Sequence, residues 1–66
     1  MFEQLVRQRV EMIVPEVSSY FYNGTLFLDC LPEQAQEIFD ELSLVYENKV
    51  QMSHVADTEY AYYFVA

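Results

Sequence analysis

The sequence predicts a small α+β domain in which the elements follow the order α-β-β-α-β-β. Three observations support this class. An apolar stripe with helical spacing runs through 32–47, an Asn-Gly pair joins two β-prone runs in 19–28, and another pair of β-prone runs closes the chain. A right-handed crossover through the helix between the hairpins would make the second and third strands parallel. We therefore expect a four-stranded mixed sheet, an amphipathic helix packed on one face, and an N-terminal helix.

The N-terminal helix is expected over residues 2–13. Pro15 disfavours the helical conformation at Val14, so the helix should end near Ile13. The apolar residues at helical spacing in this segment are Phe2, Leu5, Val6, Val10 and Ile13.

The first hairpin is predicted from Asn23-Gly24, because a type I′ turn needs positive φ at both central residues. That turn opposes Tyr22 to Thr25 and so fixes the register of the whole hairpin. Directly opposed residues share a face of the sheet. One face then carries Ser19, Phe21, Leu26 and Leu28, and the other carries Tyr20, Tyr22, Thr25 and Phe27.

The second helix is expected over Pro32–Glu47 and should end near Asn48, which can serve as a C-terminal cap. Its apolar stripe consists of Leu31, Ala35, Ile38, Phe39, Leu42, Val45 and Tyr46. Its opposite face carries no basic residue and is strongly acidic, with Glu33, Glu37, Asp40, Glu41 and Glu47. This acidic face is either a solvated surface or a site that recognises a basic protein, including by imitation of a nucleic-acid backbone.

The second hairpin is expected to pair 50–56 with 59–65 around Asp57-Thr58. A regular two-residue loop would oppose Val55 to Tyr60 and Ser53 to Tyr62. One face would then carry Val50, Met52, His54, Ala61, Tyr63 and Val65, and the other Gln51, Ser53, Val55, Tyr60, Tyr62 and Phe64. With the first hairpin, this predicts a core that includes Phe21, Leu26, Leu28, Ala35, Ile38, Phe39, Leu42, Met52 and Val65.

A chain of 66 residues forms one domain, 1–66, with a core too small to supply much stability without a staple or a partner. One cysteine excludes an intrachain disulfide, and a single histidine argues against a zinc site. Oligomerisation is the remaining device. We expect a homo-oligomer whose interface is the aromatic face of the sheet: Tyr20, Tyr22, Phe27, Tyr60, Tyr62 and Phe64. There are two alternatives: the N-terminal helix covers this face, or a different protein does.

The net charge of −8 argues against direct nucleic-acid binding, which needs a basic footprint. The aromatic strands do not reverse this expectation, because sheets that stack bases come with basic grooves and this chain has three basic residues. A basic protein is the hetero-partner that the charge favours.

No residue is assigned to catalysis, metal or cofactor binding. The sequence has no Gly-rich phosphate loop, and no strand register forces His54 and Cys30 together. No apolar run approaches the ~20 residues of a membrane span, and the N-terminus lacks the pattern of a secretory signal, so we expect a cytoplasmic or an intracellular viral protein. The sequence therefore predicts a non-enzymatic binding or regulatory protein that acts through protein contacts. A small oligomeric enzyme with an inter-subunit active site is the competing class.

Overall fold

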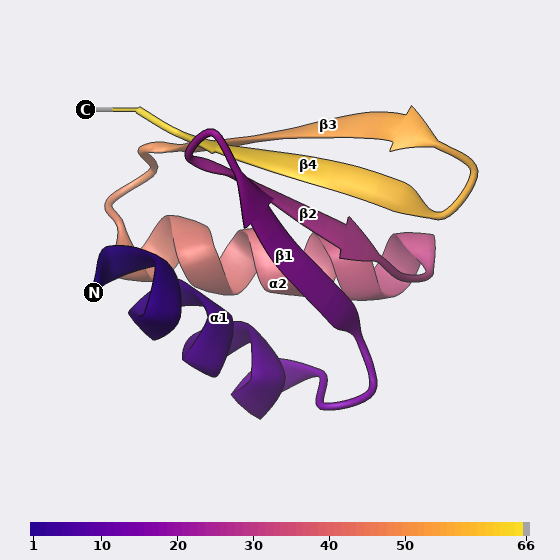
Figure 1. The fold of residues 1–66 in the computed structure, drawn as a ribbon, viewed down its shortest axis with the longest axis horizontal. Coiled ribbons are helices and arrows are strands. Elements are labelled where there is room, and N and C mark those ends of the chain that lie inside the picture. Colours follow the sequence, from indigo (N-terminus) through magenta and orange to yellow (C-terminus); the bar gives the residue numbers. More distant parts are fainter. Residues whose placement is uncertain (66) are drawn as a thin grey trace.

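The computed structural model describes residues 1–65, and their elements follow the predicted order (Figure 1). The elements are α1 (Phe2–Ile13), β1 (Ser18–Tyr22), β2 (Thr25–Asp29), α2 (Pro32–Val45), β3 (Val50–Ala56) and β4 (Glu59–Phe64). The four strands form one sheet in the order β1-β2-β4-β3. The α+β class is confirmed, and α1 begins and ends where the sequence predicts.

The prediction of a mixed sheet is wrong, because every neighbouring pair of strands is antiparallel. Strands β2 and β3 do run in the same direction, as the crossover through α2 requires, but β4 lies between them and pairs with both. The physical reason is burial. β4 is rich in aromatic residues and takes the central position, whereas β3, which carries Gln51, Ser53 and His54, takes the edge.

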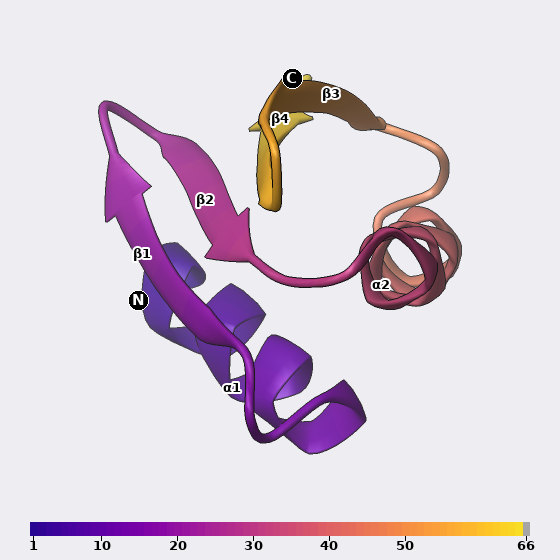
Figure 2. The ribbon, with the colours of Figure 1, turned by 90° about the vertical axis from the view of Figure 1, so that its right-hand side faces the viewer.

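Both helices pack on the same face of the curved sheet, so the fold has two layers (Figure 2). The hydroxyl of Tyr62 in β4 donates a hydrogen bond of 2.7 Å to the carbonyl of Ala35 in α2. From α1, the Phe2 ring lies edge-on to Phe64, with 5.2 Å between centroids. We call this side of the sheet the inner face and the opposite side the outer face. The alternative in which the N-terminal helix covers a second face is therefore wrong.

The first hairpin has the predicted register, with Tyr22 opposite Thr25. Asn23 and Gly24 have φ of 51° and 78°, as a type I′ turn requires. The strong local preference of the Asn-Gly pair thus sets which residues of β1 and β2 face the helices.

The predicted register of the second hairpin is wrong by one residue. Tyr60 lies opposite His54 rather than Val55, because a bulge at Val55 shifts the pairing between His54 and Ala56. Neither Asp57 nor Thr58 has positive φ. Such a turn does not match the twist of the strands as a primed turn does, and a bulge increases the local twist.

This shift reverses the faces of β4. Tyr60 and Tyr62 are buried on the inner face, and Phe64 is half-buried there. The prediction that these three residues belong to an exposed aromatic interface is therefore wrong, and the bulge is the reason. The expected core is otherwise largely present: five of its members are fully buried, namely Leu26, Leu28, Ala35, Ile38 and Leu42, and three pack partly buried against them, namely Phe21, Phe39 and Met52. Val65 is the exception, being 50% exposed.

Helix α2 ends at Val45 rather than at Glu47. Glu47 and Asn48 adopt left-handed φ of 56° and 62°, and the Asn48 amide donates to the carbonyl of Ser43 at 2.8 Å. This bond satisfies a carbonyl of the last turn in the manner of a Schellman motif. At the other end, the Leu31 amide donates to Oε1 of Gln34 at 2.9 Å, with Pro32 at the first helical position.

Among residues 1–65, no helix is long and apolar enough to cross a membrane.

The bond between Tyr62 and Ala35 predicts the effect of Tyr62→Phe. The variant should lose about 1 kcal/mol of unfolding free energy at neutral pH, measured by urea denaturation. Burial, with smaller effects of Cys30 and Tyr60, raises the pKa of Tyr62. Tyr62 therefore loses its proton at a lower pH in the unfolded chain than in the folded one. The unfolding free energy of the wild type should fall above about pH 10, and its difference from that of the variant should become smaller. An advantage that widens with pH would contradict this placement of Tyr62.

Candidate functional site

The outer face of the sheet is covered by neither helix. Alternation along the strands decides its members, since Tyr20, Phe27 and Ala61 lie directly opposite one another across β1, β2 and β4. The same rule gives the full set: Ser18, Tyr20, Tyr22, Thr25, Phe27, Asp29, Gln51, Ser53, Glu59, Ala61 and Tyr63.

Tyrosine rings dominate this face. Tyr20, Tyr22 and Tyr63 are 52%, 65% and 42% exposed, and the half-buried Phe27 stacks on Tyr20 with 5.3 Å between ring centroids. Sequence reasoning placed Tyr20, Tyr22 and Phe27 here because the Asn-Gly turn fixes their register. It missed Tyr63, because only the bulge at Val55 moves that residue to the outer face.

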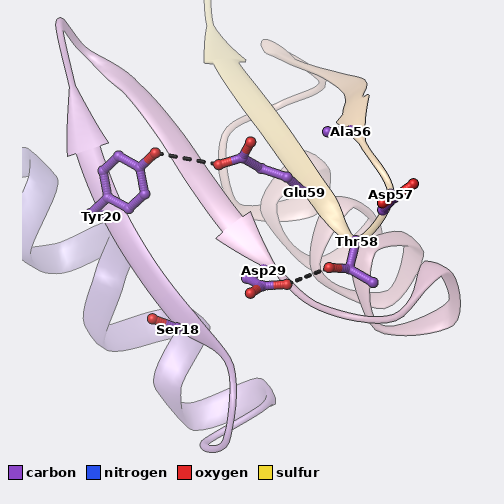
Figure 3. Close-up of a pocket in the computed structure, with 7 residues that line it drawn as sticks. All are labelled: Ser18, Tyr20, Asp29, Ala56, Asp57, Thr58 and Glu59. Carbon is purple, nitrogen blue, oxygen red and sulfur yellow. Dashed lines mark hydrogen bonds between the residues drawn. The ribbon is translucent and has the colours of Figure 1, made fainter.

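A hollow of about 360 Å³ opens at one end of the outer face (Figure 3). Its walls come from the start of β1, the end of β2 and the β3–β4 turn, and are formed by Ser18, Tyr20, Asp29, Ala56, Asp57, Thr58 and Glu59. The Thr58 hydroxyl donates to Oδ1 of Asp29 at 2.6 Å, which ties the turn to β2. The residues of β2 and of the β3–β4 turn come together only because β2 pairs with β4.

The phenol of Tyr20 spans the hollow toward Glu59 and donates to its Oε2 at 3.4 Å (Figure 3). Partial burial and the Glu59 carboxylate raise the pKa of Tyr20. The phenol is therefore neutral at physiological pH. The hollow thus combines an aromatic ring with carboxylates that retain free acceptor positions.

The charged side chains of the outer face are all acidic. Asp29, Asp57 and Glu59 gather at the hollow, and none of the four strands carries a lysine or arginine. The basic residues of the chain lie elsewhere, on α1 and in the turn before β3. Among residues 1–65 there is no group of three or more histidine, cysteine or acidic side chains arranged to hold a metal ion. Aromatic rings beside carboxylates suit guanidinium and ammonium groups.

The predicted acidic helix face lies in the helix layer and is separate from these tyrosines. Glu33, Glu37, Asp40 and Glu47 are exposed, although Glu47 follows the end of α2. Glu41 is half-buried. It lines a groove between the helices with Glu37 and with Arg9 of α1, so a cation stands beside this part of the acidic face.

The His54 side chain has structural partners, and the Cys30 side chain lies in the hydrophobic core. The His54 ring stacks on Tyr60 with 4.7 Å between centroids, and its Nε2 donates to the Asp57 carbonyl at 2.7 Å. Cys30 is buried, and that burial, with the neighbouring Asp29 carboxylate, raises the pKa of its thiol. A raised pKa disfavours the thiolate, which is the nucleophilic form.

Comparison of the chain with models of protein families, with curated proteins and with solved structures gave no match. Any function must therefore be argued from the surface itself.

The division of the tyrosines between the two faces predicts their chemical reactivity. Under native conditions, tetranitromethane should nitrate Tyr20, Tyr22 and Tyr63 well before Tyr60 and Tyr62, because the last two are buried. Peptide mass spectrometry at successive times gives the order, with urea-unfolded protein as the control in which all five react alike. Nitration of Tyr62 as fast as Tyr22 in the native protein would refute the assignment of the faces.

Proposed function

We propose that this chain is a non-enzymatic binding protein that acts through protein–protein contacts, and that its outer sheet face binds a basic surface of another protein. The observation that carries the proposal is the composition of the outer face: exposed tyrosines and clustered carboxylates, with no lysine or arginine on any strand.

Tyrosine rings would supply the centre of such an interface. A half-exposed tyrosine offers on the order of 100 Å² for burial, and a standard interface buries about 800 Å² on each partner. Tyr20, Tyr22 and Tyr63 can therefore form the core of a contact whose rim is polar. Arginine over a tyrosine ring contributes about 0.5–2 kcal/mol, the higher values when the pair is desolvated.

Charge would supply speed and selectivity. The net charge of −8 attracts a cationic partner over distances of about 8–10 Å at moderate salt. Carboxylates at the hollow would then pair with arginine or lysine side chains at one end of the contact, which would fix its orientation.

Self-association through the outer face is the second candidate, supported by the same exposed tyrosines. The salt dependence separates the two. Binding of a basic partner weakens as salt rises, whereas association of two chains of net charge −8 strengthens because salt screens their repulsion.

An arginine nonapeptide labelled with a fluorophore tests the proposal by anisotropy. The double variant Asp29→Asn/Glu59→Gln should weaken binding about five-fold at about 50 mM salt, which corresponds to on the order of 1 kcal/mol for two charge contacts. The matched control Glu33→Gln/Glu37→Gln removes the same charge from α2 and should change the affinity less. Thermal melts verify that both variants fold.

An equal loss of affinity in the two variants would show that the peptide responds only to the net charge of the protein. That result would refute the proposal that the outer face is the binding surface.

A further inference from the structure

Strand β3 forms one edge of the sheet, and its free backbone groups can be identified from the pairing with β4. The Val65 amide donates to the Lys49 carbonyl at 2.8 Å, so this opposed pair is a hydrogen-bonded one. Hydrogen-bonded and non-hydrogen-bonded pairs alternate along an antiparallel ladder. Gln51 and Ser53 therefore direct their amides and carbonyls toward β4. The backbone groups of Val50, Met52 and His54 point away from the sheet.

Residues 50–54 of this edge lack the features that usually prevent strands from pairing. Protected edges carry lysine, other charges, proline or a bulge. Strand β3 contains no lysine, arginine, carboxylate or proline, and its bulge at Val55 leaves 50–54 regular. The opposite edge is shorter. The Cys30 amide donates to the Thr58 carbonyl, so this opposed pair of the β2–β4 ladder is a hydrogen-bonded one. Alternation from this pair through β2 to β1 leaves only Ser19 and Phe21 with backbone groups that point away from the sheet.

We propose that two copies of the chain pair through β3, antiparallel about a two-fold axis at Met52, so that two four-stranded sheets become one of eight strands. This goes beyond the proposed function and uses a different part of the molecule. Val50 lies opposite His54 of the second copy, and Met52 lies opposite Met52 of the second copy. Three such pairs with two bonds each give six backbone hydrogen bonds. The contact is isologous, because the same strand serves on both sides.

Two observations favour a second copy as the occupant. The residues at the edge, 50–54, are uncharged, so the two paired strands bring no like charges into direct opposition although each chain has a net charge of −8. A hollow of about 390 Å³ lies between α2 and the start of β3, lined by Phe39, Asp40, Ser43, Leu44, Asn48 and Val50. It leaves room for inner-face side chains of the incoming strand and would let that strand cover Leu44, which is 80% exposed. The acidic helices approach each other in this dimer, so rising salt strengthens it.

The proposed register supplies its own test. Gln51 lies opposite Ser53 of the second copy on the outer face, and both residues are exposed. In the double variant Gln51→Lys/Ser53→Lys, each lysine faces a lysine across the axis. In the matched variant Gln51→Lys/Ser53→Glu, each lysine faces a glutamate. Like charges in direct opposition destabilise a strand pair, and opposite charges stabilise it.

Sedimentation equilibrium at several salt concentrations gives the dissociation constant of each dimer, and circular dichroism melts verify the fold. The lysine–glutamate variant should dimerise at least about ten-fold more tightly than the lysine–lysine variant. Net charge alone predicts the reverse order, because the lysine–lysine variant has net charge −6 (−8 + 2) and the other keeps −8. Equal constants, or a tighter lysine–lysine dimer, would overturn the proposal.

A further variant separates this dimer from self-association through the outer tyrosines. Tyr22→Asp should leave the lysine–glutamate dimer intact, since Tyr22 lies on β1, the opposite edge strand. Dissociation by Tyr22→Asp would instead assign the contact to the outer face and overturn pairing through β3. Failure of either result leaves the arginine-peptide experiment unaffected, since that experiment concerns the hollow and its carboxylates.

Discussion

The burial of Tyr62 against α2 is the constraint on which the rest of the structure depends. Its ring is fully buried, and its hydroxyl donates to the carbonyl of Ala35. The face of β4 that carries Tyr62 must therefore be the one that points toward the helices. A buried phenol without a partner would cost about 1–3 kcal/mol, and a shift of β4 by one residue would expose this ring to solvent. Alternation then places Tyr60 and Phe64 beside Tyr62 and sends Glu59, Ala61 and Tyr63 outward.

The packing of both helices on the inner face follows from the same constraint. The inner face carries Tyr60 and Tyr62 of β4 and the buried leucines of the first hairpin, and α1 completes it with Val6 and Val10. Residues 1–65 form no third helix, and neither α1 nor α2 covers the outer face. The two surfaces proposed for binding would use different interactions. The outer face offers aromatic rings and charge, whereas the β3 edge offers backbone groups without charge. Salt should therefore act on them in opposite directions.

Much of the fold could be predicted from the sequence where local signals are strong. Pro15 ends α1, the apolar stripe defines α2, and Asn23-Gly24 fixes the first hairpin and with it the outward placement of Tyr20, Tyr22 and Phe27. The second hairpin could not be predicted in the same way. Asp57-Thr58 has no strong turn preference, and no sequence pattern around Val55 predicts the bulge there.

That single bulge accounts for most of the error in the candidate site. It moved Tyr60 and Tyr62 into the core and Tyr63 to the surface. The hollow could not be predicted from the sequence for a different reason. Asp29 and Glu59 are 30 positions apart in the sequence, and only the pairing of β2 with β4 brings them together. Hydrophobic periodicity predicts which face a residue occupies, but it does not give the order of strands in a sheet.

The register of β3 against β4 is best measured by cross-strand NOEs between α protons, which are strongest in non-hydrogen-bonded antiparallel pairs. We expect such NOEs between Met52 and Tyr62 and between His54 and Tyr60. We also expect NOEs from the Tyr62 ring to Ala35. NOEs between the α protons of Ser53 and Tyr62, or of Val55 and Tyr60, would instead place the aromatic residues of β4 on the outer face and would refute the burial of Tyr62 against α2.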